Sequence, residues 1–149
     1  MLALLRNRDQ MERLWGAPEL VAPAVEEMLR YDTPVQMVHR NVLEGLEVDG
    51  QWLQAGDVVF TLLAAANRDP ARFADPDRFD VGRPDNLHLT FAWGLHFCLG
   101  ARLARLEGQL VFAALRERFS SIDLVEEPPR HPGLAFRILE ELKLRFTPR

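Results

Sequence analysis

The only cysteine of the chain, Cys98, lies between two glycines and immediately before the longest helical pattern in the sequence. Residues 91–100 read FAWGLHFCLG, with Gly94 four positions before the cysteine and Gly100 two positions after it. Leucines from position 99 to position 110 recur at spacings of four, three and four, which predicts an amphipathic helix over about 100–119. The sequence therefore predicts a glycine-bearing loop that ends at a helix N-terminus, with the thiol at the junction.

A thiol in this position has two interpretations. Free cysteines are usually small buried hydrophobes. A helix N-terminus, however, presents free N–H groups and a partial positive charge, which favour the thiolate that binds metals. One thiolate is too few for a tetrahedral zinc site, but it suffices for iron whose other ligands belong to a macrocycle, as in haem. Gly94 and Gly100 carry no Cβ, so backbone could approach a flat ligand, and Phe91 and Trp93 offer aromatic cover.

Composition narrows the class of protein. A length of 149 residues suits one domain with a real core, and the net charge of −4 argues against a nucleic-acid partner. The longest apolar run, VVFTLLAAA at 58–66, is far shorter than the roughly 20 residues that span a bilayer, and the first residues lack the pattern of a signal peptide. A single cysteine forms no internal disulfide, so we expect a cytoplasmic protein without membrane or nucleic-acid partners.

The rest of the chain predicts short helices and short strands. We expect one amphipathic helix over 2–15, and a second helix within 18–34 that has Pro23 in its first turn. Residues 35–42 read as extended, Asp49 and Gly50 mark a hairpin, and residues 58–66 lead from a strand into a short helix. We expect a last strand over 142–146.

Residues 68–90 differ from the segments around them. Pro70, Pro76 and Pro84 interrupt every regular pattern, whereas Phe73 and Phe79 need burial. This combination predicts an ordered, irregular loop packed on the protein rather than a linker.

The segment FAWGLHFCLG resembles the haem-binding loop of the cytochrome P450 family, whose fixed positions are matched by Phe91, Gly94, His96, Cys98 and Gly100. PAVEEMLRYDTPVQ resembles the family's Glu-x-x-Arg helix, AAANRDPARFADPDRFDVGRPDN the loop before the haem site, and GARLARLEGQLVFAAL the helix behind the haem. These motifs come in the family's order, cover essentially the whole chain, and look closest to the soluble bacterial branch.

The resemblance implies a mainly α fold with small β-sheets, in the α+β class. It corresponds to the C-terminal part of the cytochrome P450 fold, from the helix before the Glu-x-x-Arg helix through the haem-binding loop and the following long helix. Residues 1–149 would then form a single partial domain.

The resemblance also implies roles at the haem. Cys98 would be the axial thiolate of haem b, Gly100 would let backbone amides point at the sulfur, and Phe91 would pack beside it. His96 and Arg40 match positions that contact haem propionates, although an isolated Arg40 would otherwise be interpreted as a solvated charge.

Glu27 and Arg30 lie three residues apart on one helical face, where such a pair is usually a surface feature. In the family the same pair belongs to a buried structural triad completed by an arginine from the loop before the haem. Pro76 to Phe79 fit that loop, so we expect Arg78 as the third member, with Arg83 as the alternative.

Two further sets have both a functional and a plain interpretation. Val35, Met37 and Val38 match a strand that lines the distal pocket in the family, but they could equally be plain core residues. Arg102, Arg105 and Arg116 could form a surface on which an acidic ferredoxin docks, or they could simply be the solvated face of the helix.

The resemblance implies a haem-thiolate monooxygenase that inserts one atom of O₂ into a small organic substrate, with electrons from NAD(P)H through a ferredoxin. No residue is assigned as catalytic, because the acid–alcohol pair of the distal helix is not found, and the nearest string, AGDVV at 55–59, has no threonine. The alternatives are a non-enzymatic haem binder, an inactive truncated remnant, or one half of a split enzyme completed by an N-terminal chain.

Overall fold

The structure is a computed structural model that describes residues 1–149. Its helices are α1 (Leu2–Arg6), α2 (Arg8–Gly16), α3 (Val21–Tyr31), α4 (Leu63–Ala66) and α5 (Ala101–Arg118), with 3₁₀ turns η1 (Pro18–Leu20) and η2 (Gly94–His96). Its strands are β1 (Val38–Asn41), β2 (Leu46–Val48), β3 (Gln51–Leu53), β4 (Val58–Thr61), β5 (Phe119–Leu124) and β6 (Leu144–Pro148). The strands pair antiparallel as β1–β4, β2–β3 and β5–β6, so the expected α+β class is confirmed.

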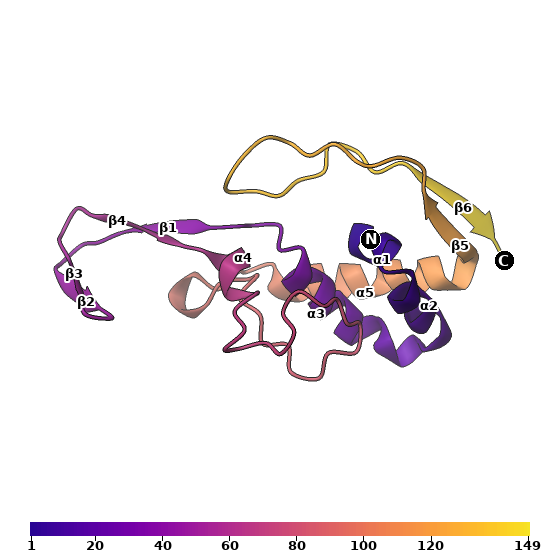
Figure 1. The fold of residues 1–149 in the computed structure, drawn as a ribbon, viewed down its shortest axis with the longest axis horizontal. Helices are drawn as coiled ribbons and strands as arrows, with labels where there is room; N and C mark the ends of the chain where they lie inside the picture. Colours follow the sequence, from indigo (N-terminus) through magenta and orange to yellow (C-terminus); the bar gives the residue numbers. More distant parts are fainter.

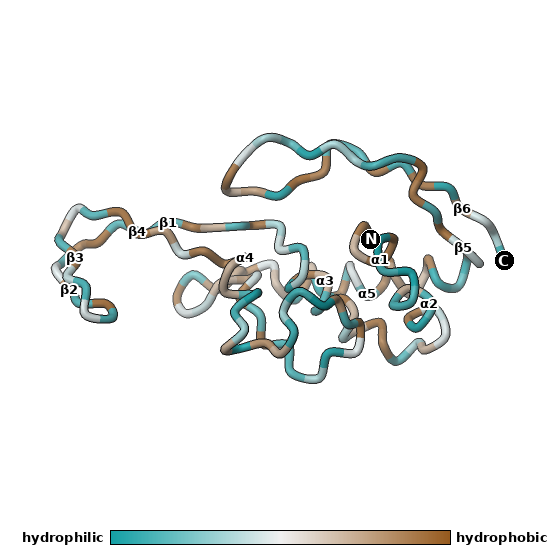
Figure 2. Tube along the Cα trace, in the orientation of Figure 1, coloured by the Kyte–Doolittle hydropathy of each residue, from teal (hydrophilic) through white to brown (hydrophobic).

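The helices form the body of the molecule, and the first two strand pairs leave it as an arm (Figure 1). Helix α5 runs along α3, the β5–β6 pair lies at the C-terminal end of α5, and the β2–β3 hairpin lies at the tip of the arm. Hydrophobic residues continue from β4 toward α4, where the arm joins the body (Figure 2). The loop that carries the cysteine therefore meets the body at the N-terminal end of α5.

Helix α5 packs on α3 through its small residues rather than its leucines. Ala101 is buried, and a Cβ added at Gly108 would lie 3.0 Å from a methyl group of Val25, so the two helices approach closely there. The predicted leucine stripe faces away from α3, with exposed fractions from 52% to 102% at Leu106, Leu110, Leu103 and Leu99. The periodicity located the helix correctly and did not reveal which face packs within this chain.

The core lies where α1, α2, α3, β5 and the 68–90 loop meet. Its buried members are Ala3, Leu4, Leu5, Met11, Leu14, Ala24, Phe79, Val81 and Ile122. Phe73 and Phe79 are each only 3% exposed, which confirms that the proline-rich segment is packed on the protein.

The single helix expected over 2–15 is wrong, because the chain breaks into α1 and α2 at Asn7. This residue has φ −124° and ψ 76°, outside the helical region. Its side-chain Nδ2 donates to the carbonyl of Ala3 at 2.8 Å, an oxygen that also accepts from the Asn7 backbone amide at 3.1 Å. An asparagine side chain that competes for local backbone groups ends helices in this way.

The hairpin expected at Asp49 and Gly50 is present between β2 and β3. Both residues have positive φ, 49° and 77°, as a type I′ turn requires. The last strand, β6, is found two residues later than expected. Its partner β5 follows α5 directly and was not predicted, and Ile122 of β5 opposes Phe146 of β6.

Candidate functional site

The cysteine-bearing loop is closed by its own backbone. After Phe91, a left-handed Gly94 (φ 73°) turns the chain into η2, and the amide of Phe97 donates to the Gly94 carbonyl at 3.0 Å. The amide of Cys98 then donates to the Phe91 carbonyl at 3.0 Å. Gly94 is required by its dihedral angle, since residues with a Cβ rarely adopt it. The structure thus brings Phe91, Gly94 and Cys98 together in one loop.

The thiol of Cys98 lies at the head of α5 and is exposed. Its carbonyl accepts from the amide of Ala101 at 3.2 Å as the helix begins, while the amides of Leu99 and Gly100 donate to no backbone oxygen. Free amides and the positive end of an 18-residue helix favour an anionic sulfur. A Cβ at Gly100 would lie 3.9 Å from Sγ, so glycine keeps space open beside the sulfur.

The surface around the thiol is apolar. Trp93, Leu95 and Leu99 are 81%, 104% and 102% exposed, and Phe97 is about half exposed. Exposed apolar side chains gathered around a polar ligand atom are typical of a binding surface. An exposed sulfur, unpaired amides and flanking apolar side chains fit a flat, hydrophobic macrocycle whose iron takes a thiolate ligand.

The two residues expected at the propionates are both exposed. Arg40 lies on β1 opposite Val59, and its Nη1 donates to the neighbouring His39 carbonyl at 2.7 Å. No carboxylate pairs with this guanidinium, so it is free to bind an anion. His96 ends η2. No hydrogen bond joins Arg40, His96 and Cys98 to one another.

The residues expected to line a substrate pocket are half-buried. Val35 forms a β-bridge with Phe136, and Val38 opposes Thr61 in the β1–β4 pair. Met37 lies between them in sequence and lines a pocket of about 270 Å³ with Leu62, Ala64, Ala65, Leu134 and Gln36. These apolar walls lie where the arm joins the body.

The Glu27 and Arg30 side chains form a pair that is completely buried. Arg30 donates to both carboxylate oxygens of Glu27, at 2.8 and 2.9 Å, and both side chains are 0% exposed. The third side chain is Arg83, whose Nε donates to Glu27 at 3.1 Å. The expectation of Arg78 is therefore wrong, because Arg78 contributes only its carbonyl, which accepts from Arg30 and Arg83.

Sequence reasoning missed a polar network beside this triad. The amide of Asn67 donates to the hydroxyls of Thr33 and Thr90, at 2.8 and 3.0 Å, and all three residues are buried. The Asn67 carboxamide oxygen accepts from the amide of Leu89 at 2.7 Å, which fixes the segment leading to the cysteine. An asparagine directly after a short apolar helix was the available signal.

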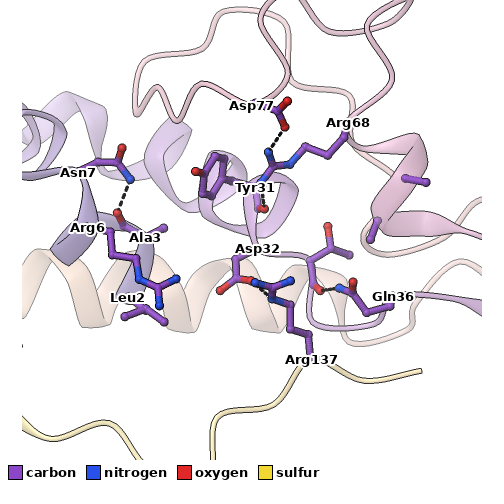
Figure 3. A pocket seen from close by; sticks show the side chains of 13 residues that line it. Leu2, Ala3, Arg6, Asn7, Tyr31, Asp32, Gln36, Arg68, Asp77 and Arg137 are labelled. Atoms are coloured by element: carbon purple, nitrogen blue, oxygen red, sulfur yellow. Dashed lines mark hydrogen bonds and ion pairs between the residues drawn. The ribbon is translucent and has the colours of Figure 1, made fainter. Parts of the chain in front are cut away.

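A larger pocket of about 440 Å³ lies between α1, the end of α3 and α4 (Figure 3). It is lined by internally satisfied charges, since Asp32 pairs with Arg137 at 2.7 Å and Arg68 with Asp77 at 2.6 Å. None of its lining residues belongs to the 91–100 loop. The candidate functional site is therefore the cysteine loop and not this pocket.

The predicted basic stripe of α5 is mostly engaged within the chain. Arg105 bonds Glu26 of α3, and the Nε of Arg116 donates to the carbonyl of Trp15 at 2.8 Å. Arg102 is exposed. As for membranes, none of the helices combines the length and the hydrophobicity that crossing a bilayer requires.

Comparison with known proteins agrees with this geometry. The family model "Cytochrome P450" matches residues 7–142. The biotin biosynthesis cytochrome P450 of Bacillus subtilis is 44% identical over 147 residues, which are 98% of this chain and 37% of that protein. The cytochrome P450 monooxygenase PikC of Streptomyces venezuelae is 43% identical over 150 residues, 98% of this chain and 36% of that protein.

Solved structures show the same likeness. The crystal structure of P450BioI in complex with an acyl carrier protein ligated to hexadec-9Z-enoic acid superposes with a TM-score of 0.94 at 44% identity. That match covers 97% of this chain and 38% of the other. Fold and sequence thus place the chain among the cytochrome P450 proteins.

The chain belongs to the cytochrome P450 family. It spans about two fifths or less of the length of the curated relatives it matches. Membership of this family implies a haem cofactor.

Proposed function

We propose that this chain supplies the haem-thiolate segment of a monooxygenase that inserts one atom of O₂ into a small organic substrate. The observation that carries the proposal is the exposed Cys98 at the head of α5, within a loop closed by the Cys98–Phe91 hydrogen bond. Bound haem supplies the iron at which dioxygen is activated. PikC, a relative, is named a monooxygenase.

Each residue of the site has a distinct role in this proposal. Cys98 would hold the iron of haem b through its sulfur, and the free amides of Leu99 and Gly100 would stabilise the negative charge of that sulfur. The unpaired guanidinium of Arg40 and the imidazole of His96 bind the propionates. The apolar side chains of Val35, Met37 and Val38 line the substrate side.

The first test is an absorption spectrum of the chain with added haemin, reduced and exposed to carbon monoxide. We expect a strongly red-shifted Soret band, because a thiolate donates electron density to the iron. Cys98→Ala should abolish this band and leave the far-ultraviolet circular dichroism of the apoprotein unchanged, since the thiol is exposed. The same band in Cys98→Ala would refute the axial assignment.

Arg40→Ala tests the propionate role separately. We expect haem affinity to fall by about tenfold, the effect of losing one charge-assisted hydrogen bond, while the red-shifted band of the bound fraction persists. A haem titration of both proteins measures the change. Equal affinities would show that Arg40 is only a solvated charge at the edge of β1.

A non-enzymatic haem binder is the second candidate, because this chain carries the thiolate side of the site and no assigned proton relay. Stoichiometric haem with a thiolate spectrum and no substrate turnover, in the presence of NAD(P)H, a ferredoxin and its reductase, would favour it. Turnover under the same conditions would favour the monooxygenase.

The remaining proposals concern partners, location and extent. An acidic ferredoxin would dock at the exposed Arg102, since Arg105 and Arg116 already make hydrogen bonds within the chain. Residues 1–149 would act as a single partial domain, which the shared core of α1–α3, β5 and the 68–90 loop supports. A cytoplasmic location and a separate N-terminal chain that completes the fold stay predictions, the latter testable by co-purification.

A further inference from the structure

Glu26 of α3 accepts hydrogen bonds from Arg105 and His88, two side chains that lie next to the cysteine loop. Its Oε1 and Oε2 accept from the Nε of Arg105 at 2.8 and 3.0 Å, and its Oε2 lies 3.1 Å from the Nε2 of His88. His88 is 1% exposed, and the other two side chains are a quarter to a third exposed. None of the roles assigned above to the haem ligands or to the buried triad uses this cluster.

The orientation of the imidazole is fixed from both sides. The Nδ1 of His88 lies 3.2 Å from the amide of Thr90, which can only donate. Nδ1 is therefore the acceptor, and Nε2 carries the proton that is donated to Glu26. Partial burial alone would raise the pKa of Glu26, but the hydrogen bonds from His88 and Arg105 outweigh burial and lower the pKa to about 2. Glu26 is thus ionised at neutral pH and accepts hydrogen bonds from both His88 and Arg105.

Both partners of Glu26 also pack against Phe91. The Cζ of Arg105 lies 4.5 Å from the centre of the Phe91 ring, and the ring of His88 lies 6.0 Å from it. The Phe91 ring in turn meets Phe97 edge-on at 6.5 Å, and the Phe91 carbonyl accepts the amide of Cys98. A cation over an aromatic face and a tilted ring pair restrain where Phe91 can sit.

We propose that Glu26 is the positioning residue of the thiolate loop, acting through Arg105 and His88 on Phe91 and hence on Cys98. The carboxylate ties α3 and α5 to the loop at the point where its backbone hydrogen bond closes. This inference deepens the proposed function, and it rests on that function only for its haem readout. It also gives Arg105 a role within the chain in place of a docking role, because the guanidinium is already paired.

The first experiment needs no haem. Glu26→Gln leaves one carbonyl oxygen where two carboxylate oxygens accepted from Arg105 and His88. The side chain at position 26 therefore loses its negative charge and one acceptor. In the full apo chain we expect amide exchange of Cys98 and Phe97 to become about tenfold faster, with exchange in β5 and β6 unchanged. Glu107→Gln, which removes the same charge from an exposed position of α5, is the matched control.

A milder pair of variants guards against loss of folding in Glu26→Gln. Arg105→Gln removes the guanidinium from Phe91, and Arg118→Gln makes the same change at an exposed position near the end of α5. We expect amide exchange of Cys98 to become faster in Arg105→Gln and to stay at the wild-type rate in Arg118→Gln. Unchanged exchange in both Glu26→Gln and Arg105→Gln would overturn the proposal.

The haem-loaded chain provides the second readout. A residue that only stabilised the fold would lower the melting temperature and leave the spectrum of the bound haem unchanged. Glu26→Gln should instead convert part of the reduced, carbon monoxide-bound sample from the red-shifted band to an unshifted one, and Glu107→Gln should not. If the wild-type chain shows no red-shifted band, the proposed function fails, while the apo exchange still decides the role of Glu26.

Discussion

Replacing Arg30 by methionine removes a guanidinium around which a large part of the site is built. The side chain is 0% exposed and donates to Glu27, to the Asn67 and Pro76 carbonyls at 2.8 and 2.9 Å, and to the Arg78 carbonyl at 3.3 Å. Methionine fills similar space with no donor. The carbonyls of Asn67 and Pro76 then lose this donor, whereas Glu27 and the Arg78 carbonyl still accept from Arg83.

The loss of free energy of unfolding in Arg30→Met depends on which donors the buried acceptors keep. Removing one partner of a buried ion pair costs about 3–5 kcal/mol. Here Glu27 keeps Arg83, Asn86 and the Asp80 amide as donors, so we take the lower end, about 3 kcal/mol. The two short carbonyl bonds add about 1 kcal/mol each. A total of about 5 kcal/mol equals the lower end of the stability of a typical domain.

The assay is urea unfolding of the chain, followed by circular dichroism. We expect Arg30→Met to be largely unfolded without denaturant. Arg13→Met, which breaks the half-exposed pair with Asp80, should change the free energy of unfolding by about 1 kcal/mol or less. If the free energy of unfolding of Arg30→Met lies within about 1 kcal/mol of that of the wild type, the buried network does not hold the loop.

Two further changes test the packing and the charges. Gly108→Leu should lower the free energy of unfolding by about 1–3 kcal/mol, because even its first carbon would lie 3.0 Å from Val25; an unchanged urea midpoint would contradict the close helix contact. Lowering the pH from 5 to 2 should weaken the fold through Glu26, because a pKa lowered from 4.5 to about 2 contributes stability that is present above pH 4.5 and lost on acidification. At about 1.4 kcal/mol per unit this is about 3 kcal/mol, reduced to about 1–2 by solvent screening, and Glu26→Gln should flatten this part of the pH profile.

Elements with a local physical cause could be predicted from the sequence. The type I′ turn follows from Asp49 and Gly50, because both positions need positive φ. Helix α5 follows from its periodicity, within one residue at each end. The cysteine loop could be located because Gly94 and Cys98 stand at fixed spacing, and the loop geometry agrees with that expectation.

Features that depend on distant partners could not be predicted. Arg78 and Arg83 lie in an irregular segment with no periodicity, so the sequence does not say which side chain turns inward and which offers a carbonyl. Strand β5 has a partner some 25 residues away, across the proline-rich turn at 128–132. Glu26 and His88 carry no signal in the sequence, because they are far apart in the chain and only the fold joins them and places His88 beside Phe91.

The buried charges have a common physical explanation. The 68–90 loop has no strand ladder and no regular helix, so its inward carbonyls need donors from elsewhere. An arginine offers five N–H groups in a fixed plane, and Arg30 and Arg83 together serve the carbonyls of Asn67, Ala74, Pro76 and Arg78. Glu27 compensates both cations. These hydrogen bonds restrain the irregular segment, and the Asn67 and Glu26 contacts extend this restraint to the residues that lead into Cys98. If Cys98 binds a metal as proposed, this restraint would help to keep its sulfur in one position, because the anchored residues Leu89 and His88 lie shortly before it in the chain.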